Sequence, residues 1–129
     1  DVAFFYDANA WWHNYSLQNM RIIIFNNDGG NIFSMLPKAY EQPELNQYFE
    51  SPHGRTAEWL AAQHQFSYLK ASFSDEDGLN NLKYQLEKLF TFDGEKTGPK
   101  LLEIFTDKAL NYDVYNKIRK YFSAFRLDV

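Results

Sequence analysis

The chain has 129 residues, enough for one domain with a substantial core, and its 45% hydrophobic and 19% aromatic content excludes a disordered polymer. Its formal net charge of -4 gives no electrostatic reason to bind nucleic acid or an anionic membrane surface. It contains no cysteine, which excludes disulfides and thiolate metal sites and fits a reducing, cytoplasmic compartment. No apolar run approaches the roughly 18 residues of a membrane helix.

The first half of the chain predicts one helix, one strand and a loop. Residues 3–15 are too long and too aromatic for a turn, and their partly polar face predicts a helix. The run "RIIIFNN", residues 21–27, is short, β-branched and apolar on both faces, as in a central parallel strand. Residues 32–36 predict a helical turn. Residues 38–55 contain prolines and a glycine without a clear period, which predicts a long loop.

The second half alternates helices with strands. Residues 56–65 predict a helix, and a second strand is expected from Ser67. Ser74 and Asp77 resemble a capping box that opens a helix with a regular apolar period. Residues 99–106 predict a third strand. The final helix is expected to carry one apolar face, formed by Leu110, Val114, Ile118, Tyr121, Phe122 and Phe125.

This alternation predicts an α/β fold, a three-layer α/β/α sandwich with a mainly parallel sheet, in one domain over residues 1–129. The chain opens without methionine at Asp1, in sequence that does not resemble a solvated terminus. We therefore expect a piece of a longer protein, shortened at its N-terminal end.

Asp1 and Asn27 are 26 positions apart, with one predicted helix and one predicted strand between them. In a parallel sheet, ligands gather at the carboxyl ends of strands, and this spacing places both side chains at one such edge if Asp1 itself ends a strand. A carbonyl at Gly29 could join them. These oxygens suit magnesium bridging a diphosphate, and a helix starting at Val2 would direct N–H groups at the phosphate. On spacing alone, ordinary turn chemistry in "NNDGG" is still the better explanation.

A family resemblance changes that balance. Asp1 followed by "NN" resembles the thiamine-diphosphate motif, Gly-Asp-Gly, a spacer and Asn-Asn, with Val2 in place of the second glycine. The stretches "DVAFFYDANAWW" and "RIIIFNNDGGNIFSMLP" resemble the C-terminal thiamine-diphosphate-binding domain of MenD-type 2-succinyl-5-enolpyruvyl-6-hydroxy-3-cyclohexene-1-carboxylate synthases, enzymes of menaquinone biosynthesis. "TAEWLAAQHQFSYLKA" and "KLLEIFTD" resemble later parts of the same domain, so the resemblance covers nearly the whole chain.

The resemblance implies roles for particular residues. Magnesium, or manganese in its place, would be held by the side chains of Asp1 and Asn27 and the carbonyl of Gly29. Ala3 stands where many relatives carry serine, which leaves its backbone as the phosphate donor. The implied cofactor-binding residues are Val2, Ala3, Asn27, Gly29, Gly30 and Ile32. The implied substrate-facing residues are Ile32, Phe33 and Leu36.

The resemblance also implies a reaction and partners. The full enzyme would decarboxylate 2-oxoglutarate on thiamine diphosphate and add the product carbanion to isochorismate, as a transferase and carboligase. The family's activating glutamate belongs to a pyrimidine-binding domain of a second subunit in a homo-oligomer, and no part of this chain resembles that domain. We therefore expect no catalytic residue in this chain and no turnover by the chain alone.

Other candidate sites have simpler explanations. His13, His53 and His64 do not share the spacing of metal ligands. Arg55, in "SPHGRTAE", could contact substrate carboxylates, but a solvated loop arginine is the better interpretation.

Two alternatives stay open. One is another thiamine-diphosphate decarboxylase or carboligase. The other is a flavodoxin-like or receiver-like signalling module that uses Asp1 or Asp28 as phosphoacceptor. Lys100 lies at the start of its predicted strand, the wrong edge for a receiver lysine, which counts against the second.

Overall fold

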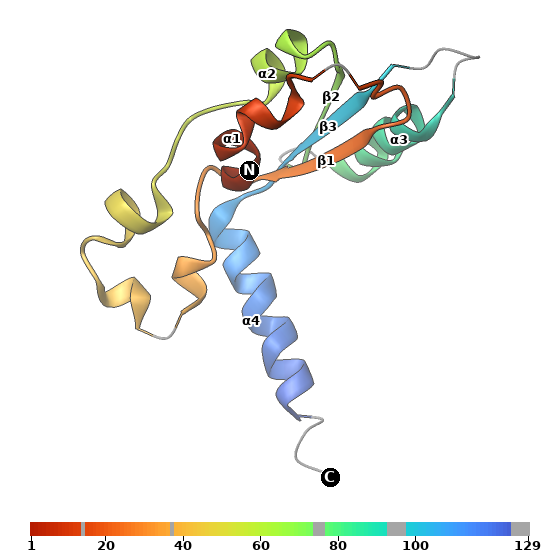
Figure 1. Ribbon diagram of the computed structural model, residues 1–129. Coiled ribbons are helices and arrows are strands. Elements are labelled where there is room, and N and C mark those ends of the chain that lie inside the picture. The colour runs from red at the N-terminus through yellow and green to blue at the C-terminus, as the bar shows by residue number, and fades with distance from the viewer. Residues whose placement is uncertain (14, 37, 74–76, 93–97, 125–129) are drawn as a thin grey trace.

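The computed structural model describes residues 1–13, 15–36, 38–73, 77–92 and 98–124. At its centre is a parallel sheet of three strands in the order β1-β3-β2 (Figure 1). These are β1 (Arg21–Asn26), β2 (Ser67–Ser72) and β3 (Lys100–Phe105). Both outer strands pair with β3 from its first residue to its last, so the three carboxyl ends form one level edge.

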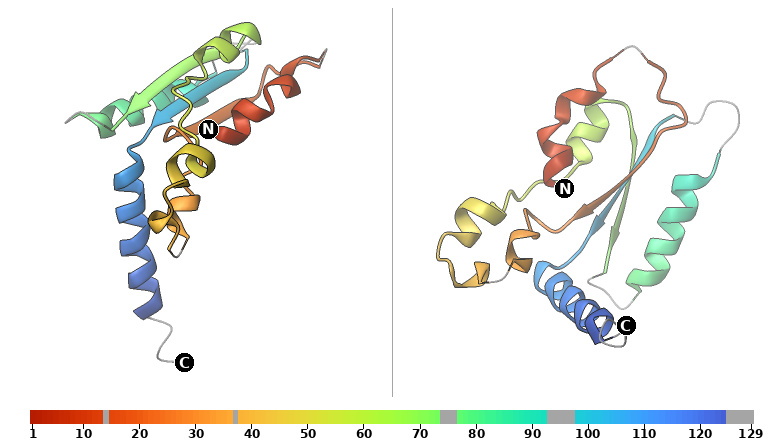
Figure 2. Two further views of the ribbon diagram at one scale, coloured as in Figure 1. Left: turned by 90° about the vertical axis from the view of Figure 1, so that its left-hand side faces the viewer. Right: turned by 60° about the horizontal axis from the view of Figure 1, so that its bottom comes forward.

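Helices cover both faces of the sheet, which confirms the predicted α/β/α layering (Figures 1 and 2). Helices α1 (Val2–Tyr6) and α2 (Glu58–Gln63) lie on one face, and α3 (Gly78–Phe90) on the other. The core is accordingly divided in two by the sheet. The first cluster contains Ile24, Ala57, Ala61, Phe66 and Leu101. The second contains Ala71, Leu89, Leu102 and Ile104.

The prediction that "RIIIFNN" is a central strand is wrong for this chain. The central strand is β3, whose inner four residues are all buried, whereas β1 lies at the edge of the sheet. Ile24 is buried against the first cluster, but Ile23 and Phe25 on the opposite face are 41% and 63% exposed. The strand is apolar on both faces as the sequence shows, and only one of those faces is covered here.

The single helix predicted for residues 3–15 is instead two short elements. Helix α1 ends at Tyr6, and a 3-10 turn, η1, occupies Ala8–Trp11. The chain turns at Asp7, whose N–H bonds the Ala3 carbonyl at 3.1 Å. After this turn, the centroid of the Trp11 ring lies 5.7 Å from the centroid of the Phe66 ring in the core.

The loop predicted for residues 38–55 is only partly irregular. It contains a 3-10 turn, η3 (Ala39–Glu41), and a π-helix, η4 (Leu45–Glu50), which ends at Ser51 in the left-handed conformation. The helical turn expected from residues 32–36 is confirmed as η2 (Phe33–Met35).

All three helices predicted for the second half of the chain are present. Helix α3 starts at Gly78, and its N-cap residue Asp77 makes no side-chain capping bond; Ser74, the other half of the predicted capping box, lies outside the described residues. Helix α4 (Lys108–Ala124) extends away from the sheet (Figures 1 and 2). Its apolar face exists but is largely exposed, at Leu110, Val114, Ile118, Tyr121 and Phe122; Phe125 is not described. None of the described helices has the length and apolar character needed to cross a membrane.

Candidate functional site

The carboxylate of Asp1 joins helix α1 to the loop that follows β1. Its Oδ1 accepts the N–H of Val2 and caps the helix, while Oδ2 accepts the N–H groups of Asn27 at 3.1 Å and Gly29 at 3.0 Å. The side chain is only 3% exposed. The predicted meeting of Asp1 with residues 27–29 at the carboxyl edge of the sheet is therefore present in the fold.

The orientation of Gly29 differs from the expectation. Its N–H, and not its carbonyl, faces Asp1, and its carbonyl accepts the N–H of Asn31 at 3.1 Å. Asn27 likewise contacts Asp1 through its backbone. In this geometry the backbone of the loop holds the carboxylate in place, and the Gly29 carbonyl is bonded to Asn31 instead of facing Asp1.

The donor set fits magnesium bound together with a phosphate. Among the described residues, no three acidic or histidine side chains cluster in a way that could hold a metal unaided. What lies here is one carboxylate, on Asp1, in contact with the backbone of Asn27 and Gly29. Magnesium in proteins usually takes one or two carboxylates and fills its other positions with water and phosphate oxygens.

Two glycines let a distant segment approach this loop. Gly29 has a φ of 141°, and a Cβ there would overlap the carbonyl oxygen of Glu50. The N–H of Gly30 donates to that same oxygen at 2.7 Å, and a Cβ on Gly30 would lie 2.8 Å from the carbonyl oxygen of Phe49. The end of η4 is thus in direct backbone contact with the glycines.

An ion pair holds the same end of η4 to helix α4. Lys108 Nζ lies 2.7 Å from Glu50 Oε2, and the two side chains are 30% and 7% exposed. Lys108 is the first residue of α4, so the pair links the carboxyl edge of the sheet to the segment that packs on Gly29 and Gly30.

His53, which the sequence analysis set aside, contacts Asp1. Its Nδ1 accepts the N–H of Arg55 at 2.9 Å, so the neutral ring carries its proton on Nε2, which donates to Asp1 Oδ2 at 3.2 Å. Asp28 Oδ1 accepts the N–H groups of His53 at 3.0 Å and Gly54 at 2.7 Å. These bonds lock residues 53–55 against the loop after β1.

Beneath the two loops lies a buried carboxylate, Glu103, on the central strand. It is fully buried and accepts three hydrogen bonds, from Asn26 Nδ2 at 2.7 Å, Ala57 N at 3.0 Å and Tyr68 Oη at 2.6 Å. Burial, together with the hydrogen bond to Glu103 and its charge, raises the pKa of Tyr68 well above its usual range. Tyr68 is therefore a proton donor to Glu103 at any physiological pH.

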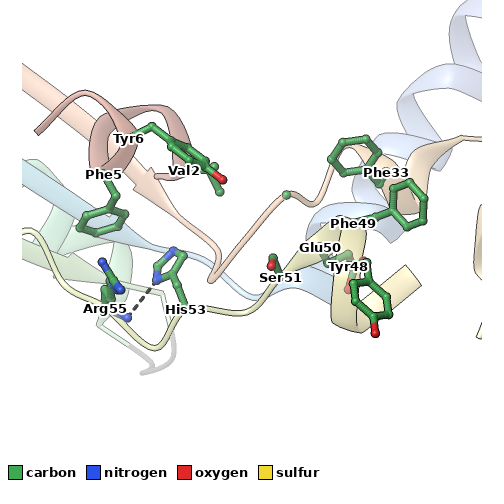
Figure 3. A pocket seen from close by; sticks show the side chains of 11 residues that line it. Val2, Phe5, Tyr6, Phe33, Tyr48, Phe49, Glu50, Ser51, His53 and Arg55 are labelled. Carbon is green, nitrogen blue, oxygen red and sulfur yellow. Dashed lines mark hydrogen bonds between the residues drawn. The ribbon is translucent and has the colours of Figure 1, made fainter. Parts of the chain in front are cut away.

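A pocket of about 590 Å³ opens beside Val2 and His53, between α1 and the ends of η2 and η4 (Figure 3). Phe5 and Tyr6 stand on one side, Phe33 and Phe49 on the other, and His53 lies between them. Its lining includes three residues predicted from the sequence: Val2, Gly30 and Phe33.

Two predicted substrate-facing residues do not line this pocket. Ile32 is 68% exposed and Leu36 is 52% exposed, and Ala3 is also exposed on α1. Arg55 is exposed as expected and lines the pocket. It also lines a second pocket of about 370 Å³ at the carboxyl ends of β1 and β3.

Comparison with known proteins supports the family resemblance. The chain is 44% identical over 106 residues to 2-succinyl-5-enolpyruvyl-6-hydroxy-3-cyclohexene-1-carboxylate synthase of Flavobacterium johnsoniae, which covers 82% of this chain and 18% of the relative. The synthase of Cytophaga hutchinsonii is 38% identical over 120 residues, 93% of this chain and 20% of the relative. That of Christiangramia forsetii is 40% identical over 115 residues, 88% of this chain and 18% of the relative.

No family model matches the chain. The chain spans about a fifth of the length of the curated relatives it matches. The similarity nevertheless runs through most of this chain and includes relatives that carry one shared name. By descent, this chain belongs with the 2-succinyl-5-enolpyruvyl-6-hydroxy-3-cyclohexene-1-carboxylate synthases and corresponds to one segment of them.

Proposed function

We propose that this chain is the diphosphate- and magnesium-binding segment of a thiamine-diphosphate-dependent synthase of menaquinone biosynthesis. The observation that carries the proposal is the contact of Asp1 with Asn27 and Gly29 at the carboxyl edge of the sheet. The names of the relatives support the enzyme class. A cytoplasmic location belongs to the same proposal.

Each part of the site has its own task. Asp1, Asn27 and the Gly29 carbonyl would hold magnesium, or manganese, and the backbone at Val2 and Ala3 would meet the diphosphate. Asp1 is nearly buried and is already held by three backbone N–H groups, whereas the Gly29 carbonyl, which accepts the Asn31 N–H, would have to turn toward the metal. Gly30 and Ile32 extend this surface toward the cofactor's ring.

The reaction proposed for the whole enzyme is decarboxylation of 2-oxoglutarate and transfer of the resulting carbanion to isochorismate. When bound, thiamine diphosphate supplies the electron sink for this chemistry. The residues of this chain orient the cofactor and, at Phe33, add apolar wall beside it. Catalysis needs a glutamate from the pyrimidine-binding domain of a second subunit, so the chain alone is proposed to bind without turnover.

Calorimetric titration with thiamine diphosphate and magnesium tests the proposal, on this chain and on a chimera in which it replaces the matching segment of the Flavobacterium johnsoniae synthase. Asn27→Ala should weaken magnesium-dependent binding about tenfold or more, and EDTA should abolish it. Asn27→Ala is cleaner than Asp1→Ala, because Asp1 also caps α1 whereas Asn27 contacts Asp1 only through its backbone N–H.

Asp7→Ala is the matched control, since Asp7 is an exposed carboxylate at the other end of α1. Its binding should equal that of the wild type. A chimera that folds but binds no thiamine diphosphate contradicts the proposal. So does binding that is indifferent to EDTA and to Asn27→Ala. If the chimera binds thiamine diphosphate but prefers a 2-oxo acid other than 2-oxoglutarate as substrate, a different decarboxylase or carboligase is favoured.

The signalling alternative has less support in the fold. Lys100 is the first residue of β3 and lies at the amino edge of the sheet, opposite Asp1 and Asp28. A receiver-type site needs its lysine at the same edge as its acids.

A further inference from the structure

Glu103 occupies an unusual position for a carboxylate. It is 0% exposed in the middle of the central strand, where apolar residues surround it on the chain. All three of its hydrogen-bond partners are neutral: an asparagine amide, a backbone N–H and a tyrosine hydroxyl. A buried carboxylate costs free energy to desolvate, and an apolar side chain would fill this position more cheaply. Its position in the core therefore calls for a reason beyond packing.

The hydrogen bonds of Asn26 show what Glu103 controls. Asn26 is 3% exposed and uses both amide hydrogens, one to Glu103 Oε1 at 2.7 Å and one to the Arg55 carbonyl at 2.9 Å. Its Oδ1 accepts the N–H of Asp28 at 3.0 Å. These partners fix the amide orientation, because a flipped amide would face two acceptors with its oxygen and the Asp28 N–H with its NH₂ group.

From Asn26 the connections reach Asp1 by two routes. Asp28 is held with a φ of 63°, and the loop that contains it presents the N–H groups of Asn27 and Gly29 to Asp1. The Arg55 segment carries His53, whose Nε2 donates to Asp1. Glu103 therefore lies at the base of both loops that surround the Asp1 carboxylate.

We propose that Glu103 is a positioning residue for the magnesium–diphosphate site, acting through Asn26 to fix the loop after β1 and the His53–Arg55 segment around Asp1. This inference rests on the proposed function. It assigns a role to two residues outside the residues that would touch metal or cofactor, and it explains why the apolar strand β3 contains a buried acid. Groups that orient metal ligands in this way typically change metal affinity 10–100-fold when they are removed.

Glu103→Gln is the sharpest variant, because it keeps the size of the side chain. Two donors, Ala57 N–H and Tyr68 O–H, face Oε2, so the glutamine oxygen is expected to take that side. The glutamine NH₂ then faces the NH₂ of Asn26, and the link to the loop breaks. Tyr68→Phe is the matched control: it removes one bond from the same carboxylate and leaves the Asn26 link intact.

Two readouts separate positioning from stability. In the chimera with thiamine diphosphate present, we expect Glu103→Gln to weaken magnesium binding about 10–100-fold and Tyr68→Phe to change it less than about twofold. In this chain without ligand, amide exchange followed by NMR should show the Asp28 N–H losing protection in Glu103→Gln but not in Tyr68→Phe. Asn26→Ala, which leaves Glu103 two of its donors, should reproduce the weaker binding if Glu103→Gln does not fold.

Contrary outcomes are distinct. A folded Glu103→Gln or Asn26→Ala variant with wild-type affinity for magnesium overturns the positioning role, and so does an equal loss of affinity in Tyr68→Phe. A loss of affinity in Glu103→Gln with full protection of the Asp28 amide overturns the route through Asn26. If the wild-type chimera binds no cofactor, the proposed function fails and this inference fails with it. That result concerns the wild type and is therefore distinct from a failure seen only in a variant.

Discussion

Replacing Gly29 with alanine tests how closely the glycine loop packs against the end of η4. Gly29 has a φ of 141°, where a residue other than glycine is strained by about 1–3 kcal/mol. A Cβ would also overlap the Glu50 carbonyl oxygen and lie 3.2 Å from its carbonyl carbon, so one backbone must move. That movement threatens the 2.7 Å bond from Gly30 N–H, a loss of about 1 kcal/mol. Together we expect a free energy of unfolding lower by about 2–4 kcal/mol.

Urea denaturation followed by circular dichroism measures this change, with an unchanged slope showing that the folded and unfolded states keep their compactness. Gly54→Ala is the matched control. Gly54 also has a positive φ, 58°, but its built Cβ has no neighbour within 4 Å, so alanine there should cost only about 1–2 kcal/mol. If Gly29→Ala is no more destabilising than Gly54→Ala, the inference of a tight backbone contact with Glu50 is refuted.

Two further predictions concern the charged groups around the site. Lys108→Met leaves the nearly buried Glu50 without its cation and should lower the free energy of unfolding by about 1–3 kcal/mol, a range kept below that of a fully buried pair because Lys108 is 30% exposed. Adding Glu50→Gln should recover most of this loss in urea titrations, and a double variant as unstable as the single one would argue against the ion pair. Tyr68→Phe should lower the free energy of unfolding near neutral pH. The difference in this free energy between the wild type and the variant should narrow as pH rises past about 10. Above that pH the native state keeps the Tyr68 proton that the unfolded chain loses, so the stability of the wild type falls. A difference between wild type and variant that stays constant from pH 8 to 11 in urea titrations would contradict this.

The order of the elements could be predicted from the sequence because strands and helices have local signatures. A short β-branched run marks β1, an apolar run marks β3, and the glycine-bearing loop marks the end of β1. Which strand is central could not be predicted, because sheet order depends on pairing between distant segments. Both "RIIIFNN" and "KLLEIFT" are apolar enough for the middle of a sheet, and only the fold shows that β3 takes that position.

Part of the site was predictable for a geometric reason. The spacing of Asp1 and Asn27 matches one crossover in a parallel sheet if a strand ends at Asp1, and the structure places the Asp1 carboxylate against the backbone of Asn27. No spacing rule predicts the contact of His53 with Asp1, because His53 follows η4 in a segment whose sequence has no regular period. Glu103 could have been recognised from the sequence, because a lone acid inside an apolar strand needs buried hydrogen-bond donors. Such a residue is expected to connect several segments through its hydrogen bonds.

The two halves of the candidate site differ in how far this chain completes them. The polar half is formed by residues of this chain. Asp1 is nearly buried, and a series of hydrogen bonds connects it to His53, Asp28, Asn26 and Glu103. The apolar half is open, with Ile32, Phe33 and Leu36 between 37% and 68% exposed. On the proposed function, the chain therefore carries an anchor for metal and diphosphate whose carboxylate, on Asp1, is already held in place, while the reactive end of the cofactor needs a second surface to exclude water. That division predicts measurable cofactor binding without turnover by this chain, and turnover only where another domain covers the apolar residues.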